Sequence, residues 1–247
     1  MDWIQLQIFC FAPTPRAEKN LSDEGKTKNT LLVGDTLIET AYFIRDIALS
    51  RSDIISSLKL EPNQFILVTS HRKENVDNID NARDITSALL SIDSQVVYPM
   101  HPRTQKMYTK FGLLKKLKNK IRIIEPVGYL DFITLINYSK LIMTDSGGVQ
   151  QEAAIFDIPC LTLRRNTEWI ETVESGKNEL IGTDKIKIIE KLDEILSNKD
   201  LYQKMIDAPC PFKIGAANKI VNHIEKSFKS GSLLMESSNF LLDGLPK

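Results

Sequence analysis

Short apolar runs alternate with longer segments whose apolar residues recur every three or four positions along most of this chain of 247 residues. A short apolar run between polar residues is typical of a buried parallel strand, and the longer period is typical of a helix. The pattern predicts strands at 65–69, 95–98, 121–124, 141–143, 160–163 and 179–181. It predicts helices at 79–90, near 105–111, and at 129–138, 149–156, 168–175 and 185–196. This alternation predicts an α/β fold with a doubly wound parallel sheet.

The segment before position 60 gives a less regular pattern. Residues 3–12 and 30–34 have the composition of short strands, and residues 16–25 and 36–50 have helical character. Two short strands and two helices cannot by themselves bury both faces of a parallel sheet. We therefore do not interpret this opening as a complete domain.

The stretch from Lys140 to Phe156 combines a strand, a glycine turn and the start of a helix. Glycines let a ligand approach the backbone, and a helix N-terminus offers N–H groups and the positive end of a dipole, so Ser-Gly-Gly at 146–148 suits a phosphate. The pattern places Glu152 in about the first turn of the helix, where its carboxylate would accept hydrogen bonds from the hydroxyls of a ribose. The alternative is an ordinary N-cap and tight turn, in which Glu152 only interacts favourably with the helix dipole.

Polar side chains also follow three other predicted strands. His71, His101 and Arg164 come after strands, as Ser146 does. Ligands of doubly wound sheets bind outside the carboxyl ends of the strands, so we expect these four loops to converge on one crevice. Each also has a simpler interpretation: a solvated loop at 70–75, a structural histidine at 101 and a surface charge at 164. The residues alone leave both interpretations open.

Composition restricts the class of partner and the compartment. The chain has 32 Lys and Arg against 32 Asp and Glu, and this zero net charge argues against nucleic acid or an anionic membrane as the partner. The three cysteines are widely spaced and odd in number, which suits a reducing compartment, and they show no metal-binding spacing. We expect neither a metal ion nor a cofactor. No apolar run has transmembrane length, and the N-terminus does not have the pattern of a signal peptide. We therefore expect a soluble, cytoplasmic protein.

Five spaced motifs occur in one order along the chain, and two shorter strings precede them. The short strings are Phe-Ala-Pro-Thr at 11–14 and Val-Gly-Asp-Thr at 33–36. The five motifs are Thr-Ser-His-Arg-Lys-Glu-Asn at 69–75, Tyr-Pro-Met-His-Pro-Arg at 98–103, Glu-Pro-Val-Gly-Tyr-Leu-Asp-Phe at 125–132, Thr-Asp-Ser-Gly-Gly-Val-Gln-Gln-Glu at 144–152 and Asn-Thr-Glu-Trp-Ile-Glu-Thr-Val at 166–173. Together they resemble the non-hydrolysing UDP-N-acetylglucosamine 2-epimerases, and the resemblance extends from about residue 11 to residue 228.

The resemblance implies a glycosyltransferase-B-like fold, in which the second, Rossmann-like domain holds UDP. We accordingly expect a remnant of the first domain and the interdomain connection at 1–59, a Rossmann-like UDP-binding domain at 60–229, and a tail at 230–247. The implied reaction interconverts UDP-GlcNAc and UDP-ManNAc, by elimination of UDP to a 2-acetamidoglucal and re-addition on the other face of C2. Such a nucleotide-sugar isomerase would feed polysaccharide biosynthesis, as a homodimer or with a partner chain that supplies the first domain.

The resemblance also assigns roles to single residues. His101 matches the functional histidine of the family, and its expected role is to stabilise or protonate the departing pyrophosphate. The implied substrate-binding residues are Ser146, Gly147 and Gly148 for the diphosphate, Glu152 for the ribose, Phe132 near the uracil, and Arg72 and Glu74 near the cleft.

The sequence departs from the family pattern at three places. Trp169 stands where many members have arginine, and Pro-Phe-Lys-Ile-Gly at 211–215 replaces a pattern richer in glycine and aspartate. Nothing before Phe11 matches the glycine-rich loop and the acidic residues that move the C2 proton in the family's first domain. We therefore expect this chain alone to bind UDP weakly and to turn over little. The alternatives are an inactive UDP-binding fragment, half of a split enzyme, and a UDP-sugar glycosyltransferase of the same fold.

Overall fold

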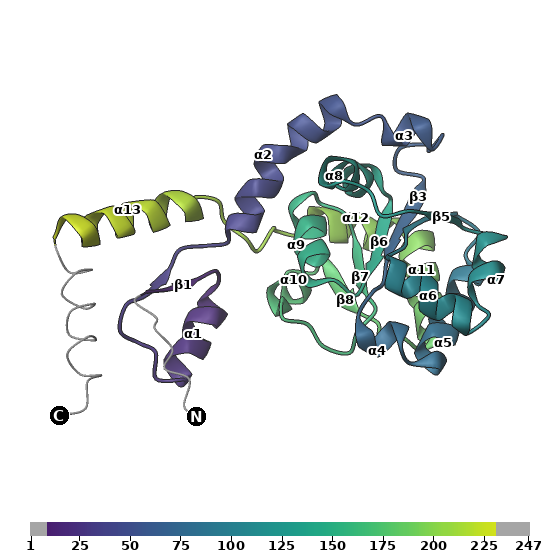
Figure 1. Cartoon of the computed structure of the whole chain (residues 1–247), viewed down its shortest axis with the longest axis horizontal. Helices are drawn as coiled ribbons and strands as arrows, with labels where there is room; N and C mark the ends of the chain where they lie inside the picture. Colours follow the sequence, from purple (N-terminus) through teal and green to yellow (C-terminus); the bar gives the residue numbers. More distant parts are fainter. Residues whose placement is uncertain (1–8, 231–247) are drawn as a thin grey trace. The chain divides into compact units, whose positions relative to one another are not determined.

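The computed structural model describes residues 9–230, which fall into two compact units. Unit 1 takes its described residues from 9–40 and 212–230, and unit 2 contains residues 41–211. Helix α2 (Thr36–Arg51) carries the chain from unit 1 into unit 2. The elements of both units are labelled in Figure 1.

Unit 2 is built on a sheet that has six strands among the described residues, in the order β5-β4-β3-β6-β7-β8 (Figure 1). Every neighbouring pair of strands is parallel. The doubly wound parallel sheet expected from the sequence is thereby confirmed. The strands are β3 (Phe65–Thr69), β4 (Gln95–Pro99), β5 (Arg122–Ile124), β6 (Leu141–Thr144), β7 (Cys160–Thr162) and β8 (Asn178–Leu180).

Helices cover both sides of this sheet (Figure 1). They are α3 (Ile54–Ser57), α4 (Lys73–Val76), α5 (Ile79–Ser91), α6 (Pro102–Lys110), α7 (Leu114–Lys118), α8 (Tyr129–Tyr138), α9 (Gly147–Ile155), α10 (Ile170–Glu174), α11 (Lys185–Ser197) and α12 (Lys199–Asp207).

The central strands are apolar along their whole length because both of their faces are covered. All residues of β3 and β6 are buried. Ile66 and Val68 of β3 belong to a core cluster that also contains residues of α5, α6, α7, α11 and α12. Because side chains alternate between the two faces of a strand, Leu67 points to the opposite side, and it is equally buried.

The strand order reverses between β3 and β6. The chain runs from β3 outward to β4 and β5 and then returns to β6, which pairs with β3 on its other side. The last residues of the two strands are partners, and the hydroxyls of Thr69 and Thr144 are 2.6 Å apart. The loops after β3 and β6 therefore start side by side, at the kind of reversal point where doubly wound sheets bind ligands.

Unit 1 contains a parallel pair of short strands. Thr14 caps the helix between them by accepting the backbone N–H of Ala17 at 3.1 Å. The unit's elements are β1 (Cys10–Ala12), α1 (Pro15–Asp23), β2 (Thr30–Leu32) and α13 (Ala216–Lys229).

The beginning of α13 is held to the first turn of α2. The carboxylate of Glu39 accepts the backbone N–H groups of Gly215 and Ala217, the latter at 2.9 Å. Gly215 has φ 105°, a left-handed conformation that a side chain would strain. Gly215 is the N-cap through which the chain enters α13.

Most predicted elements agree with the structure, and β3 and α8 agree at both ends. Three differences matter for the site. The predicted loop 70–77 contains the short helix α4. Helix α6 begins at Pro102 rather than near 105, with His101 as its N-cap. Helix α9 begins at Gly147, so Glu152 lies in the second turn of the helix instead of the first.

Helices α7 and α12 were not predicted, because the first is very short and the second buries a single residue, Met205.

The two units divide the chain at 40/41 and 211/212, whereas the sequence suggested divisions at 59/60 and 229/230. Residues 41–59 group with the sheet because α3 packs against α8. Helix α13 groups with unit 1, where Glu39 binds its first residues. The expected tail lies, from residue 231 onward, outside the described residues.

Candidate functional site

Asp145, the first residue after β6, organises the loops at the reversal point. It is wholly buried. Its carboxylate accepts hydrogen bonds from the Ser70 hydroxyl at 2.8 Å, from the backbone N–H groups of His71 and Arg72 at 3.0 Å each, and from the side-chain amide of Asn75 at 3.0 Å. Hydrogen bonds to a charged acceptor are stronger than those between neutral groups. Asp145 therefore fixes the loop after β3 against the loop after β6.

The loop after β4 is tied to the same point. The hydroxyls of Tyr98 and Thr104 both donate to the carbonyl of Ser70, at 2.8 and 3.0 Å. The ring centroids of His71 and His101 are 6.4 Å apart. The loops after β3, β4 and β6 thus meet at the carboxyl edge of the sheet.

His101 is exposed and has a defined hydrogen-bonding state. Its Nδ1 accepts the backbone N–H of Arg103 at 3.1 Å, which caps α6. An imidazole nitrogen that accepts a hydrogen bond carries no proton, so the neutral ring holds its proton on Nε2. His101 therefore presents an N–H donor to an anion bound at this edge of the sheet.

The Ser-Gly-Gly turn forms the start of α9. Ser146 is the N-cap, and its backbone N–H donates to the hydroxyl of Thr144 at 3.0 Å. The first N–H groups of a helix have no partner within the helix, and together with the helix dipole they attract anions. A Cβ added to Gly147 would lie 3.0 Å from Nε1 of Trp169, so no larger residue fits without moving that ring. Trp169 therefore packs directly on the turn.

Gly147→Ala is expected to lower the free energy of unfolding by about 1–2 kcal/mol, because the added methyl group must displace the indole of Trp169. Urea denaturation followed by tryptophan fluorescence measures the change. Gly128→Ala is the matched control, since a Cβ at Gly128 meets nothing within 4 Å. Equal stability of the two variants would contradict the tight contact between Gly147 and Trp169.

Glu152 faces α8 from the second turn of α9. It is 4% exposed, and Tyr129 Oη donates to its Oε1 at 2.9 Å. Burial raises the pKa of Glu152 to about 7, and the hydrogen bond from Tyr129 opposes part of this rise. Phe132, which is half-buried, lies one turn after Tyr129 on the same helix and therefore on the same side of it. Phe132, predicted to lie near the uracil, and Tyr129, which contacts Glu152, are thus on the same helix.

Two arginines converge on Glu168, which lies beside the turn at 146–148. Arg164 Nη1 donates to the Glu168 carboxylate at 2.6 Å and Arg72 Nη2 donates at 3.2 Å. The hydrogen bond from Arg164 is the main reason why the pKa of Glu168 is lowered to about 2. Glu74 completes the cluster, with its Oε1 3.7 Å from Arg164 Nε. Arg164 is therefore an ion-paired residue, and the cluster joins the loop after β7 to the loop after β3.

A small hollow of about 220 Å³ opens beside this cluster. Glu74 and Arg164 line it together with Asn75, Asn81, Arg165, Asn166, Gly182 and Thr183. Within residues 9–230, no group of three histidines, cysteines or acidic residues is placed to hold a metal ion. Over the same residues, no helix has the length and apolar character needed to span a membrane.

The profile of the UDP-N-acetylglucosamine 2-epimerase family matches residues 6–225. The chain belongs to this family. The resemblance of its motifs is thereby confirmed, and so is the fold class, because solved epimerases of this glycosyltransferase-B-like fold superpose on the chain.

Three comparisons show how far the similarity extends. A UDP-N-acetylglucosamine 2-epimerase of Methanocaldococcus jannaschii is 42% identical over 204 residues, which are 78% of this chain and 56% of that protein. A UDP-2,3-diacetamido-2,3-dideoxy-D-glucuronate 2-epimerase of Pseudomonas aeruginosa is 40% identical over 75% of this chain and 52% of its own length. The crystal structure of the M. jannaschii UDP-GlcNAc 2-epimerase with UDP-GlcNAc and UDP superposes with a TM-score of 0.79, at 38% identity, over 88% of this chain and 60% of that chain. The chain therefore spans somewhat more than half the length of these relatives.

Several residues that shape the candidate site were not singled out from the sequence. Asp145 stood inside a recognised motif, and its position directly after a buried strand was the available signal. Tyr129 and Glu168 also belong to motifs that matched the family, but their contacts with Glu152 and with the two arginines depend on segments far apart in the chain. Of the predicted residues, Arg72 and Glu74 join the Glu168 cluster, Ser146 to Gly148 form the turn, and His101 lies beside His71.

Proposed function

We propose that this chain is the UDP-binding part of a UDP-N-acetylglucosamine 2-epimerase, which interconverts UDP-GlcNAc and UDP-ManNAc. The observation that carries the proposal is the arrangement of α9. Its N-terminal turn, Ser146 to Gly148, offers N–H groups for a diphosphate, and Glu152 lies in the second turn of the same helix. The exposed His101 lies at the same carboxyl edge of the sheet.

In this proposal each predicted residue has a separate task. The turn at 146–148 binds the diphosphate, Glu152 accepts ribose hydroxyls, and Phe132 contacts the uracil. Arg72 and Glu74 border the cleft through their cluster with Arg164 and Glu168.

The proposed reaction breaks two bonds of the substrate. The proton leaves C2, UDP leaves C1, and the electron pair of the C2–H bond forms the double bond of 2-acetamidoglucal. Negative charge develops on the departing diphosphate, where the Nε2–H of His101 would stabilise or protonate it. The base that takes the C2 proton is assigned to the family's first domain, as a further part of the working enzyme.

We propose further properties of assembly, activity, location and pathway on the same basis. The working enzyme acts as a homodimer or together with a partner chain that supplies the first domain, and this chain alone has little or no turnover. In this proposal the reaction takes place in the cytoplasm and feeds polysaccharide biosynthesis.

Product analysis tests the assigned reaction. The chain, combined with the first domain of a relative, is incubated with UDP-GlcNAc and no acceptor. Formation of UDP-ManNAc supports the epimerase, whereas sugar transfer that requires an added acceptor identifies a glycosyltransferase. Tight UDP binding without any product identifies an inactive nucleotide-binding module.

The affinity for UDP-GlcNAc is expected to rise about tenfold between pH about 6 and about 8. The pKa of Glu152 is raised to about 7, so its carboxyl group is protonated at the lower pH and is ionised, and a better acceptor for ribose hydroxyls, at the higher one. Both phosphates of UDP-GlcNAc are esterified, so the ligand keeps its charge over this range. Calorimetric titration at the two pH values measures the effect. Glu152→Gln should bind more weakly than the wild type at the higher pH and show no such rise; a rise that persists in this variant would assign the titration to another group.

A further inference from the structure

The segment 103–124 is strongly basic, although the whole chain has no net charge. It contains no acidic residue, and its cations are Arg103, Lys106, Lys110, Lys115, Lys116, Lys118, Lys120 and Arg122. All of them are exposed. Arg103 pairs with Asp77 at 2.6 Å. The others lie on α6 and α7, in the connection between α7 and β5, and at the start of β5.

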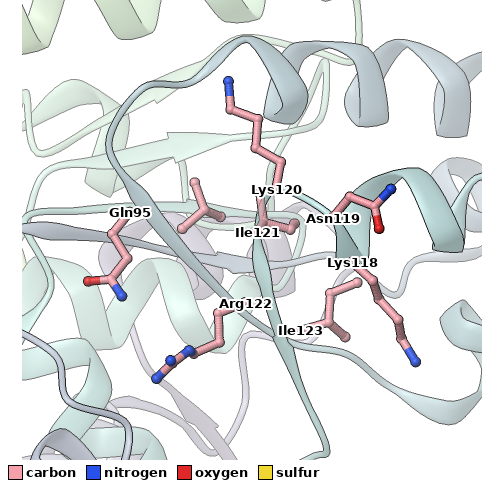
Figure 2. A pocket seen from close by; sticks show the side chains of 8 residues that line it. Gln95, Lys118, Asn119, Lys120, Ile121, Arg122 and Ile123 are labelled. Atoms are coloured by element: carbon pink, nitrogen blue, oxygen red, sulfur yellow. The ribbon is translucent and has the colours of Figure 1, made fainter.

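Two hollows open on this basic surface. The first has a volume of about 580 Å³ and is lined by residues 118–123 together with Gln95 and Val96 (Figure 2). The second has a volume of about 430 Å³ and is lined by residues of the segment 109–119. They share Lys118 and Asn119, and we call the two together the basic trough. Gln95 and Arg122 begin β4 and β5, so the trough lies at the amino ends of these strands, opposite the candidate site.

The charges of the trough are only slightly compensated within the described part of the chain. Lys120 Nζ donates to the carbonyl of Leu90 at 2.6 Å, and Arg122 Nη1 donates to the carbonyl of Leu58. Both acceptors are uncharged. Asp93 lies 3.8 Å from Lys120, but its side chain is wholly exposed, where an ion pair is weak. Lys118 lies in the last turn of α7, where it also interacts with the negative end of the helix dipole. That end carries the equivalent of only about half a unit charge, which does not neutralise an ammonium group.

The geometry of the trough distinguishes among anionic partners. In Figure 2, Lys118, Lys120 and Arg122 point in different directions around the hollow and do not converge on one point. A small anion could contact one of them, whereas an extended polyanion could contact all three. The apolar lining residues, Val96, Ile121 and Ile123 among them, are aliphatic, so the hollow offers no aromatic platform for nucleic-acid bases. Its concave shape also suits a chain segment better than the flat surface of a bilayer.

We propose that the basic trough is a docking site for an acidic, extended segment of a partner protein, with aliphatic residues between its carboxylates. The carboxylates would pair with Lys118, Lys120 and Arg122, and the aliphatic side chains would contact Ile121 and Ile123. Such charge complementarity speeds association and selects the partner. The proposal is independent of the proposed enzymatic activity, because the trough lies at the opposite end of the sheet.

Fluorescence anisotropy of the full chain with a short labelled peptide of glutamate and leucine tests the proposal. At an ionic strength of about 20 mM we expect saturable binding that weakens at least about tenfold at about 500 mM, because salt screens exposed charges. The same peptide with glutamine in place of glutamate should not bind. Absence of binding by the glutamate peptide, or equal binding of the two peptides, overturns the proposal.

Variants locate the binding to the trough. Lys118→Gln/Lys120→Gln/Arg122→Gln should weaken binding at least about tenfold, whereas Lys185→Gln/Lys187→Gln/Lys199→Gln, which removes three exposed charges of α11 and α12, should change it less than about twofold. Because Arg122 contacts Leu58, Lys118→Glu alone serves as a second variant that leaves that contact in place. Equal effects of the trough variants and the control overturn the assignment. Tighter, trough-dependent binding of a single-stranded oligonucleotide or of phosphatidylglycerol vesicles overturns it in favour of that class.

Discussion

Asp145→Asn is expected to lower the free energy of unfolding by about 2–4 kcal/mol, because several buried donors lose their charged acceptor at once. The donors are the Ser70 hydroxyl, two backbone N–H groups and the Asn75 amide. An asparagine offers one carbonyl oxygen and turns an NH₂ group toward donors that need acceptors. Urea denaturation measures the loss, and UDP titration should show weaker binding, since the loop after β3 is no longer fixed.

The matched control is Asp93→Asn, which removes the same charge from a wholly exposed side chain. We expect a change of less than about 0.5 kcal/mol there. Hydrogen exchange separates the local effect from the global one. The amides of His71 and Arg72 should lose protection in Asp145→Asn more than the amides in the middle of β3 do. Unchanged protection of these two amides would show that Asp145 does not hold the loop.

His101→Ala is expected to reduce turnover at least about tenfold in an enzyme in which the family's first domain is present. The proposed reason is the loss of the Nε2–H donor where negative charge develops on the diphosphate. Formation of UDP-ManNAc from UDP-GlcNAc measures the rate. UDP affinity should change less than turnover, because the turn at 146–148 and Glu152 remain in place.

His101 is also the N-cap of α6, so its removal has a structural effect that must be separated from a catalytic one. His101→Asn supplies that control, because asparagine is a good N-cap residue but has no imidazole. We expect both variants to lose turnover, and only His101→Ala to lose about 1 kcal/mol of stability. Wild-type turnover in His101→Asn would remove the imidazole from the mechanism and leave His101 with a capping role.

Local sequence was sufficient where a short segment decides its own conformation. The apolar run at 65–69 forms β3 with the predicted ends, because a strand covered on both faces needs apolar residues at every position. Residues 129–138 form α8 as predicted from their helical period. The glycine pair after β6 likewise begins a helix, as the change from an apolar run to Ser-Gly-Gly predicted.

The contacts within the site could not be predicted from local sequence, because they join segments that lie far apart in the chain. Asp145 is bound by residues about 70 to 75 positions earlier, and Glu152 is bound by a tyrosine 23 positions earlier. The period of apolar residues predicts which side of a helix or strand is buried. It does not predict which side chain of a distant loop will contact that side. The short helix α4 is a further example, since its Asn75 is held by Asp145 and by the carbonyl of Leu163.

The sequence by itself determined the alternation of strands and helices, the family, and the motifs that follow several of the strands. Only the tertiary structure decided that Asp145 is a buried acceptor for the loop after β3, that Tyr129 contacts Glu152, and that Trp169 packs on Gly147. The physical reason is that hydrophobic period acts over a few neighbouring residues, whereas burial, hydrogen-bond partners and pKa shifts arise from the packing of whole elements against each other.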